Sequence, residues 1–182
     1  IKLTRIDDKK ADVKSSEQAE NIRKNLENCS LRVSGIAFKK VTRRPRPPHI
    51  TSTLQQAGSS SHGYSPKRTM SIAQRLYEGI DVKGELVGLI KYMRTDSFTV
   101  SREAQDLCRD FVKAEYGNEY IPKTPNRYKS RSSAQEAHEA IRPTDVTRTP
   151  KSLAGRLEPE QLKVYTLIWQ RFVASQMSPA QI

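Results

Sequence analysis

The run Tyr92–Ser97 (YMRTDS) holds the residue types in this chain that are best suited to chemistry on a phosphate group. It follows the apolar run 86–90, which predicts a buried strand, so Tyr92 and Arg94 are expected at the carboxyl end of that strand. Residues two apart on a strand project from the same face, about 6.5 Å apart. Tyr92 and Arg94 could therefore meet one phosphate, and Asp96 would share their face if the strand continued. The last three residues of the run could equally begin a turn.

The chemistry of this pair suits nucleophilic attack. A phenol ordinarily has a pKa of about 10, so an attacking tyrosine needs help in losing its proton. An adjacent guanidinium can bind a phosphate bidentately and stabilise the charge that develops on it. The product would be a phosphotyrosine ester that retains the energy of the broken linkage, so resealing needs no ATP. A tyrosine at a strand end more often packs with its hydroxyl in water, and the residue types alone do not separate these readings.

A second candidate, His138, lies in the run 134–143 (AQEAHEAIRP). If this run is helical, Gln135, His138 and Arg142 share one face. The histidine could then hydrogen-bond a phosphate or exchange a proton near neutral pH. It could also be a surface histidine held by Glu139 or by solvent.

Carboxylates that could hold Mg²⁺ for phosphodiester chemistry are not evident in the sequence. The adjacent pair Asp7–Asp8 falls on an expected turn, where we predict it to be solvated. If a metal is used, its ligands are expected outside this chain.

Composition points to a polyanionic partner. Lys and Arg number 32 against 20 Asp and Glu in 182 residues, a net charge of +12. This excess favours nucleic acid, and no amphipathic pattern competes for a membrane. No apolar run approaches the ~20 residues of a membrane span, and no signal peptide is evident. The two cysteines, Cys29 and Cys108, are far apart and predict neither a disulfide framework nor a zinc site.

The pattern of elements predicts an α+β fold. The N-terminal part is expected to hold a strand over 1–5, a helix over 15–28 and a strand over 31–41. The proline-rich, basic stretch 45–48 predicts a hinge, whose charges either contact phosphates or are solvated. Helices are expected to dominate residues 50–178. Their expected positions are 51–57, Ser65–Pro66 to Gly79, Ser101 to Gly117, a short segment at 135–142, and a last helix beginning near Pro159, with loops at 58–64 and 118–134.

Four ordered runs resemble the type IA family of bacterial DNA topoisomerase I. They are residues 50–57 (ITSTLQQA), 70–79 (MSIAQRLYEG), 92–97 (YMRTDS) and 135–143 (QEAHEAIRP). The resemblance covers about 44–178 well and 1–43 more loosely. It implies that residues 1–48 are part of a β-rich arch or hinge domain, 49–175 a helical domain with the active tyrosine, and 176–182 a return toward the arch.

The resemblance also implies roles for individual residues. Tyr92 would join the 5′ phosphate of a cut single strand, Arg94 would hold the scissile phosphate, and His138 would support the same site. The implied DNA contacts are Arg94, Asp96, Gln135 and Arg142. The whole enzyme would pass a strand through the break, reseal it and so relax negative supercoils.

The resemblance further implies partners that this chain does not contain. Mg²⁺ would be held by a Toprim domain elsewhere in the polypeptide, and the substrate would be single-stranded or underwound DNA in the bacterial cytoplasm, associated with the nucleoid. We expect a fragment without the Toprim domain to be inactive in relaxation.

Two other functions compete. A non-catalytic, basic nucleic-acid-binding module would explain the charge without a nucleophile. A tyrosine recombinase or type IB enzyme also uses tyrosine, but places its Arg and His residues before it, whereas His138 and Arg142 follow Tyr92 here.

Overall fold

The computed structural model describes residues 3–6, 8–30, 32–33, 35–82, 84–129 and 138–182. The chain forms two compact units, residues 1–39 and residues 40–182. Each unit is described by itself below.

The first unit is small and holds one helix and one hairpin. Ser15 caps helix α1 (Ser16–Glu27) by accepting from the N–H of Gln18, which confirms the predicted helix. Strands β1 (Arg5–Ile6) and β2 (Lys9–Lys10) pair antiparallel. The strand predicted over 31–41 is wrong for residues 32, 33 and 35–40, which pair with no other strand and include several exposed apolar residues. Val41, at the end of the range, exchanges backbone hydrogen bonds with Ile182 at 2.8 and 3.0 Å.

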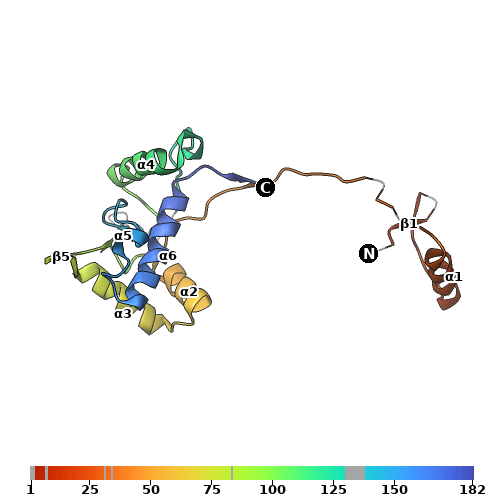
Figure 1. Ribbon diagram of the computed structural model, residues 1–182, viewed down its shortest axis with the longest axis horizontal. Helices are drawn as coiled ribbons and strands as arrows, with labels where there is room; N and C mark the ends of the chain where they lie inside the picture. Colours follow the sequence, from red (N-terminus) through yellow and green to blue (C-terminus); the bar gives the residue numbers. More distant parts are fainter. Residues whose placement is uncertain (1–2, 7, 31, 34, 83, 130–137) are drawn as a thin grey trace. The chain divides into compact units, whose positions relative to one another are not determined.

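Helix α6 (Pro159–Ser175) lies centrally in the second unit, in contact with α2 (Thr51–His62), α3 (Pro66–Glu78) and α5 (Pro150–Leu153) (Figure 1). The buried residues of α6 include its predicted apolar stripe from Tyr165 to Phe172. The buried indole N–H of Trp169 donates to the carbonyl of Val146 at 2.9 Å. The last helix therefore organises the core, as its pattern indicates.

The loop predicted at 58–64 is wrong, because α2 continues to His62. Gly58 is buried where α2 packs on α3, and a Cβ there would lie 2.5 Å from the hydroxyl oxygen of Thr69. Gly63 then ends the helix in the left-handed conformation. The predicted cap at Ser65 is confirmed, since its side chain accepts from the N–H of Arg68. The small polar residues therefore permit a close helix contact and do not form a flexible loop.

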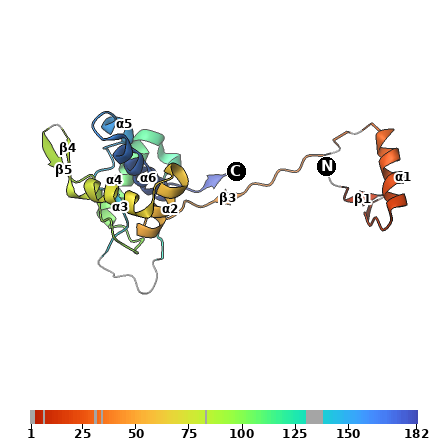
Figure 2. The same ribbon diagram turned by 90° about the horizontal axis from the view of Figure 1, so that it is seen from below.

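Strands β4 (Ile80–Val82) and β5 (Glu85–Val87) form a hairpin that projects from the helical body (Figures 1 and 2). The buried strand predicted at 86–90 is therefore divided. Leu86 is exposed on the hairpin, and only Leu89 and Ile90 are buried. Between Leu86 and Leu89, Gly88 lets the chain pass close to the end of α3, because a Cβ there would lie 2.9 Å from the carbonyl oxygen of Tyr77.

Two further strand pairs complete the unit. Strand β3 (Thr42–Arg43) pairs antiparallel with β8 (Ala180–Gln181), so the two ends of the unit lie side by side. Strand β6 (Ile90–Lys91) pairs antiparallel with β7 (Arg142–Pro143). Helix α4 (Arg102–Tyr116) is capped by Ser101 and ends before Gly117, as predicted, and a 3-10 turn, η1 (Asn118–Tyr120), follows. The α+β class is confirmed, while the predicted domain boundaries stay predictions.

Candidate active site

Tyr92 does not continue the strand before it. Strand β6 ends at Lys91, and Tyr92 takes the left-handed conformation, with a φ of 56°. The prediction that Tyr92 and Arg94 project from the same face of a strand, with Asp96 beside them if the strand continued, is wrong for this reason. A non-glycine residue in this conformation costs about 1–2 kcal/mol, so the surrounding contacts must hold it. Tyr92 is half-buried and Arg94 is exposed.

The segment after Tyr92 is fixed by the first turn of α2. The backbone N–H of Thr51 donates to the carbonyl of Thr95 at 3.0 Å. The hydroxyl of Thr51 accepts from the N–H of Thr95 at 2.9 Å and lies 3.1 Å from the carbonyl oxygens of Met93 and Thr95. Arg94 is thus held between two anchored residues, next to the N-terminus of a helix.

His138 reaches Tyr92 from a distant part of the sequence. Their ring centroids lie 6.1 Å apart, with an interplanar angle of 59°. The strand pair β6–β7 makes this possible, since Lys91 lies opposite Arg142 and the chain before Arg142 runs back past Tyr92. Residues 138–142 do not form the helix that would have placed His138 and Arg142 on one face, and Ile141 and Arg142 instead make β pairings.

A buried ion pair supports the segment that carries His138. Glu139 accepts from the guanidinium of Arg142 at 2.7 Å and from the N–H of Ser101 at 3.2 Å. Burial raises the pKa of Glu139, but these hydrogen bonds and the charges of Arg142 and Lys91 outweigh it and lower the pKa. The carboxylate therefore stays ionised and ties His138's neighbour to the start of α4.

Two adjacent hollows share Arg94. Tyr92, Met93 and Arg94 line the first together with three residues of α3: Gln74, Tyr77 and Glu78. Arg94 lines the second with Thr95, Asp96, His138 and the start of α2, which contributes Ile50, Thr51, Ser52 and Gln55. Arg94 therefore lines both the hollow beside Tyr92 and the hollow at the N-terminus of α2.

The second hollow is suited to an anion. The first turn of a helix carries backbone N–H groups without intrahelical partners and the positive end of the helix dipole. The guanidinium of Arg94 adds a full positive charge on the same hollow, and His138 offers a ring nitrogen. Asp96 is exposed at the rim and opposes an anion, so it is better placed to orient basic groups than to contact phosphate.

The remaining predicted DNA contacts differ in position. Gln135 lies outside the described residues. Arg142 is buried, and its guanidinium donates to Glu139 and, at 3.4 Å, to the carbonyl of Pro143. Its place in the fold is structural, and a direct contact between Arg142 and DNA has no support from this geometry.

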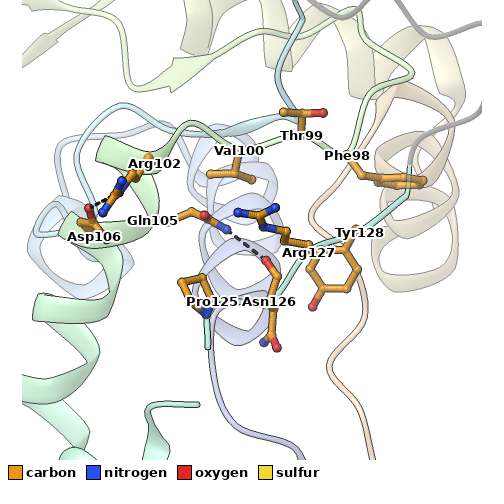
Figure 3. Close-up of a pocket in the computed structure, with 10 residues that line it drawn as sticks. All are labelled: Phe98, Thr99, Val100, Arg102, Gln105, Asp106, Pro125, Asn126, Arg127 and Tyr128. Atoms are coloured by element: carbon orange, nitrogen blue, oxygen red, sulfur yellow. Dashed lines mark hydrogen bonds and ion pairs between the residues drawn. The ribbon is translucent and has the colours of Figure 1, made fainter. Parts of the chain in front are cut away.

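A separate hollow beside α4 is shown in Figure 3. Phe98, Val100 and Tyr128 line it together with Arg102 and Arg127. Nearby, Gln105 donates to the carbonyl of Asn126 at 3.0 Å, and Asn126 donates to carbonyls at the end of α6. These bonds fasten the loop before residue 129 to the helical body.

The start of α2 contributes site residues that the sequence alone does not predict. Thr51, Ser52 and Gln55 line the hollow around Arg94 and His138, and Thr51 bonds the segment beyond Tyr92. The run 50–57 is one of the four runs that resemble the type IA family, and no residue in it is predicted to act in the site. A helix-opening threonine was the available signal, but which segment it bonds depends on tertiary contacts.

Known proteins are similar to this chain over most of its length. The family model described as DNA topoisomerase matches residues 2–182. The chain belongs to this family. The topoisomerase chain is 44% identical to DNA topoisomerase 1 of Rickettsia bellii over 97% of its own length and 22% of that protein. It is 44% identical to DNA topoisomerase 1 of Campylobacter jejuni over 94% of its length and 25% of that protein.

A solved structure of a topoisomerase I is also similar to this chain. The full-length topoisomerase I of Thermotoga maritima matches with a TM-score of 0.74 and 38% identity, over 97% of this chain and 27% of that one. The topoisomerase chain therefore spans about a quarter of the relatives it matches. Across the described residues, no helix is long and apolar enough to cross a membrane. The same residues bring together no group of three His, Cys, Asp or Glu side chains that could hold a metal.

Proposed function

We propose that this chain is the tyrosine-bearing part of a bacterial type IA DNA topoisomerase that cuts and reseals one DNA strand. The observation that carries the proposal is the meeting of Tyr92, Arg94, His138 and the N-terminus of α2 around two joined hollows. The nucleophile and the phosphate-binding cation come from one segment of the chain, the histidine from a second and the helix N–H groups from a third. Membership of the topoisomerase family supplies the substrate class.

In the proposed reaction, the phenolic oxygen of Tyr92 attacks the phosphorus of a DNA backbone phosphate. A bond forms between that oxygen and phosphorus, and the bond from phosphorus to the 3′ oxygen of the neighbouring sugar breaks. The phenol loses its proton, and the departing 3′ oxygen gains one. One phosphodiester replaces another, so the reverse attack by the 3′ hydroxyl reseals the strand without ATP.

Arg94 would hold the scissile phosphate and stabilise the charge that develops on its oxygens. The backbone N–H groups of the first turn of α2 beyond Thr51, whose own N–H donates to Thr95, would act on the same phosphate. His138 lies against the ring of Tyr92 and would position the phenol. Asp96 would orient neighbouring basic groups.

Relaxation of negative supercoils is proposed for the full-length enzyme only. It requires Mg²⁺, which we place on carboxylates in a Toprim domain elsewhere in the polypeptide. Because those groups are outside this chain, the isolated 182-residue chain should not relax DNA.

The test is covalent trapping of a labelled single strand by full-length topoisomerase that carries this chain, followed by denaturation with detergent. The wild type should retain label on the protein, and Tyr92→Phe should retain none while still binding DNA. Label retained by Tyr92→Phe would exclude this tyrosine as the nucleophile. An unlabelled wild type would favour the non-catalytic binding module, which the net positive charge also supports.

A further inference from the structure

A second basic groove lies on the other side of α2 from the candidate active site. It has a volume of about 670 Å³ and is formed by α2, α6 and the segment Arg46–Pro47. Its charged side chains are Arg46 and Arg171, and no Asp or Glu is among the residues that line it. The polar side chains that line it are Thr53, Gln56, Ser60, Ser61 and Gln170. The groove thus combines positive charge with neutral hydrogen-bonding groups.

The two arginines are held together without a counter-ion. Burial lowers the pKa of Arg171, and the nearby charge of Arg46 lowers it further. Neither guanidinium forms an ion pair within the described part of the chain, whereas Arg68, for example, pairs with Glu160. Like charges in proximity cost folding free energy. Arg46 is exposed and Arg171 is half-buried, so both guanidinium groups can reach an anion in the groove, and two arginines without an acidic neighbour are typical of an anion-binding site.

His49 forms part of the same groove but adds no charge. Burial, and then the charge of Arg171, lower its pKa to about 3. Its Nδ1 lies 3.2 Å from the hydroxyl oxygen of Thr53. Arg46, His49 and Arg171 are the titratable groups that line the groove, so its charge should not change between pH 5 and pH 8.

We propose that this groove binds a phosphate of the DNA backbone, at a subsite separate from the cleavage site. The proposal rests on the proposed function, because that function supplies DNA as the ligand. Arginine pairs bind phosphate oxygens through parallel hydrogen bonds, and the side chains of Ser61 and Gln170 can add more.

Continuity with the rest of the chain favours DNA over a small anion. The basic residues Arg43 and Arg44 lead directly to Arg46. Helix α2 carries the active-site hollow on its first turn and this groove from Thr53 to Ser61. The two sites are offset by roughly 12 Å or less along the axis of α2, at 1.5 Å per residue, and lie on opposite sides of a helix about 10 Å thick. Several nucleotides at about 3.4 Å each can span this separation.

The test compares Arg46→Gln/Arg171→Gln with Arg156→Gln in full-length topoisomerase that carries this chain. Arg156 is exposed near the opposite end of α6, so this control removes positive charge without touching the groove. Binding of a fluorescent single-stranded oligonucleotide is measured by anisotropy over a series of salt concentrations. The double variant should bind roughly tenfold more weakly, and its salt slope should be smaller by about 0.7, the contribution of one lost single-strand phosphate contact.

A salt slope no smaller in the double variant than in wild type would overturn the proposal. Urea unfolding of the same variant should show unchanged or higher stability, because a like-charge contact is removed. Weaker binding accompanied by lost stability would also overturn it, since unfolding would then explain the loss. The affinity difference between wild type and the double variant should be the same at pH 5.5 and pH 8, at about tenfold.

Two further arms identify the source of the phosphate. An oligonucleotide with an uncharged methylphosphonate backbone should bind wild type and the double variant equally. Inorganic phosphate that stabilises wild type but not the double variant, while DNA affinity is equal in both, would show a free-anion site and exclude DNA. Covalent trapping by the double variant at saturating DNA should remain, so a failure of this subsite is distinct from a failure of Tyr92 as nucleophile.

Discussion

The backbone N–H of Thr51 donates to the carbonyl of Thr95 at 3.0 Å, and the Thr51 hydroxyl accepts from the N–H of Thr95 at 2.9 Å. This reciprocal pair joins the start of α2 to the segment that carries Tyr92 and Arg94. It explains how an exposed arginine can be held in a defined place. The helix N-terminus and the backbone of Arg94 are thereby fixed relative to one another.

Thr51→Val should therefore damage both stability and cleavage. It leaves the N–H of buried Thr95 without its partner, which costs about 1–3 kcal/mol. We expect that loss in urea unfolding of the chain, and roughly tenfold less covalent adduct from the full-length enzyme. Thr51→Ser keeps the hydroxyl and should retain most of both. Equal adduct yields from the Val and Ser variants would contradict this role.

The backbone of Tyr92 should be strained. We expect the free energy of unfolding, measured in urea, to be about 1 kcal/mol higher for Tyr92→Gly than for Tyr92→Ala, because glycine adopts a positive φ without cost. Both variants lack the ring, so the comparison isolates the backbone. At an unstrained position alanine would be equal or better, and that ranking would refute the strain.

The contact between α2 and α3 should not tolerate a side chain at position 58. A Cβ at Gly58 would lie 2.5 Å from the hydroxyl oxygen of Thr69, which is buried and donates to the carbonyl of Ser65. Gly58→Ala should destabilise the chain by about 1–3 kcal/mol, although alanine usually stabilises a helix. Thr69→Ala should make the Gly58→Ala change less costly. Additive costs in thermal unfolding would argue against the clash.

The burial of His49 should make stability depend on pH. Its pKa is lowered to about 3 in the folded chain, whereas an unfolded histidine titrates near pH 6.5. The unfolded state therefore binds more protons than the folded state as pH falls below 6.5. The free energy of unfolding has its full value above that pH and decreases below it. From pH 7 to pH 5, wild type should lose about 2 kcal/mol more than His49→Gln in urea unfolding. Parallel losses would show that His49 is not the group responsible.

Arg142 should act on folding and not on DNA. Its ion pair with Glu139 is largely buried, so Arg142→Ala leaves that carboxylate with the N–H of Ser101 but without a counter-charge, and should cost up to about 3 kcal/mol. The double variant Glu139→Gln/Arg142→Met should recover part of that loss. The salt slope for DNA binding should match wild type in the double variant. A smaller slope there would restore Arg142 as a phosphate contact.

Local features of the sequence determined much of this protein. Ser15, Ser65 and Ser101 open their helices as predicted, because an N-cap needs only a side-chain oxygen and the N–H groups of the next turn. The stripe on α6 is buried as predicted, because helical periodicity places its apolar residues on one face. The residue types in YMRTDS indicate phosphate chemistry, which stays a prediction, whereas the strand spacing expected for them is wrong.

Only the tertiary structure decided how the site is assembled. Strand β6 stops at Lys91 because the following segment bonds to Thr51, and this bond joins parts of the chain that no local pattern relates. His138 meets Tyr92 through the pairing of β6 with β7, not through a helix face. Propensity and periodicity describe near neighbours in sequence, whereas these contacts depend on which distant segments pack together.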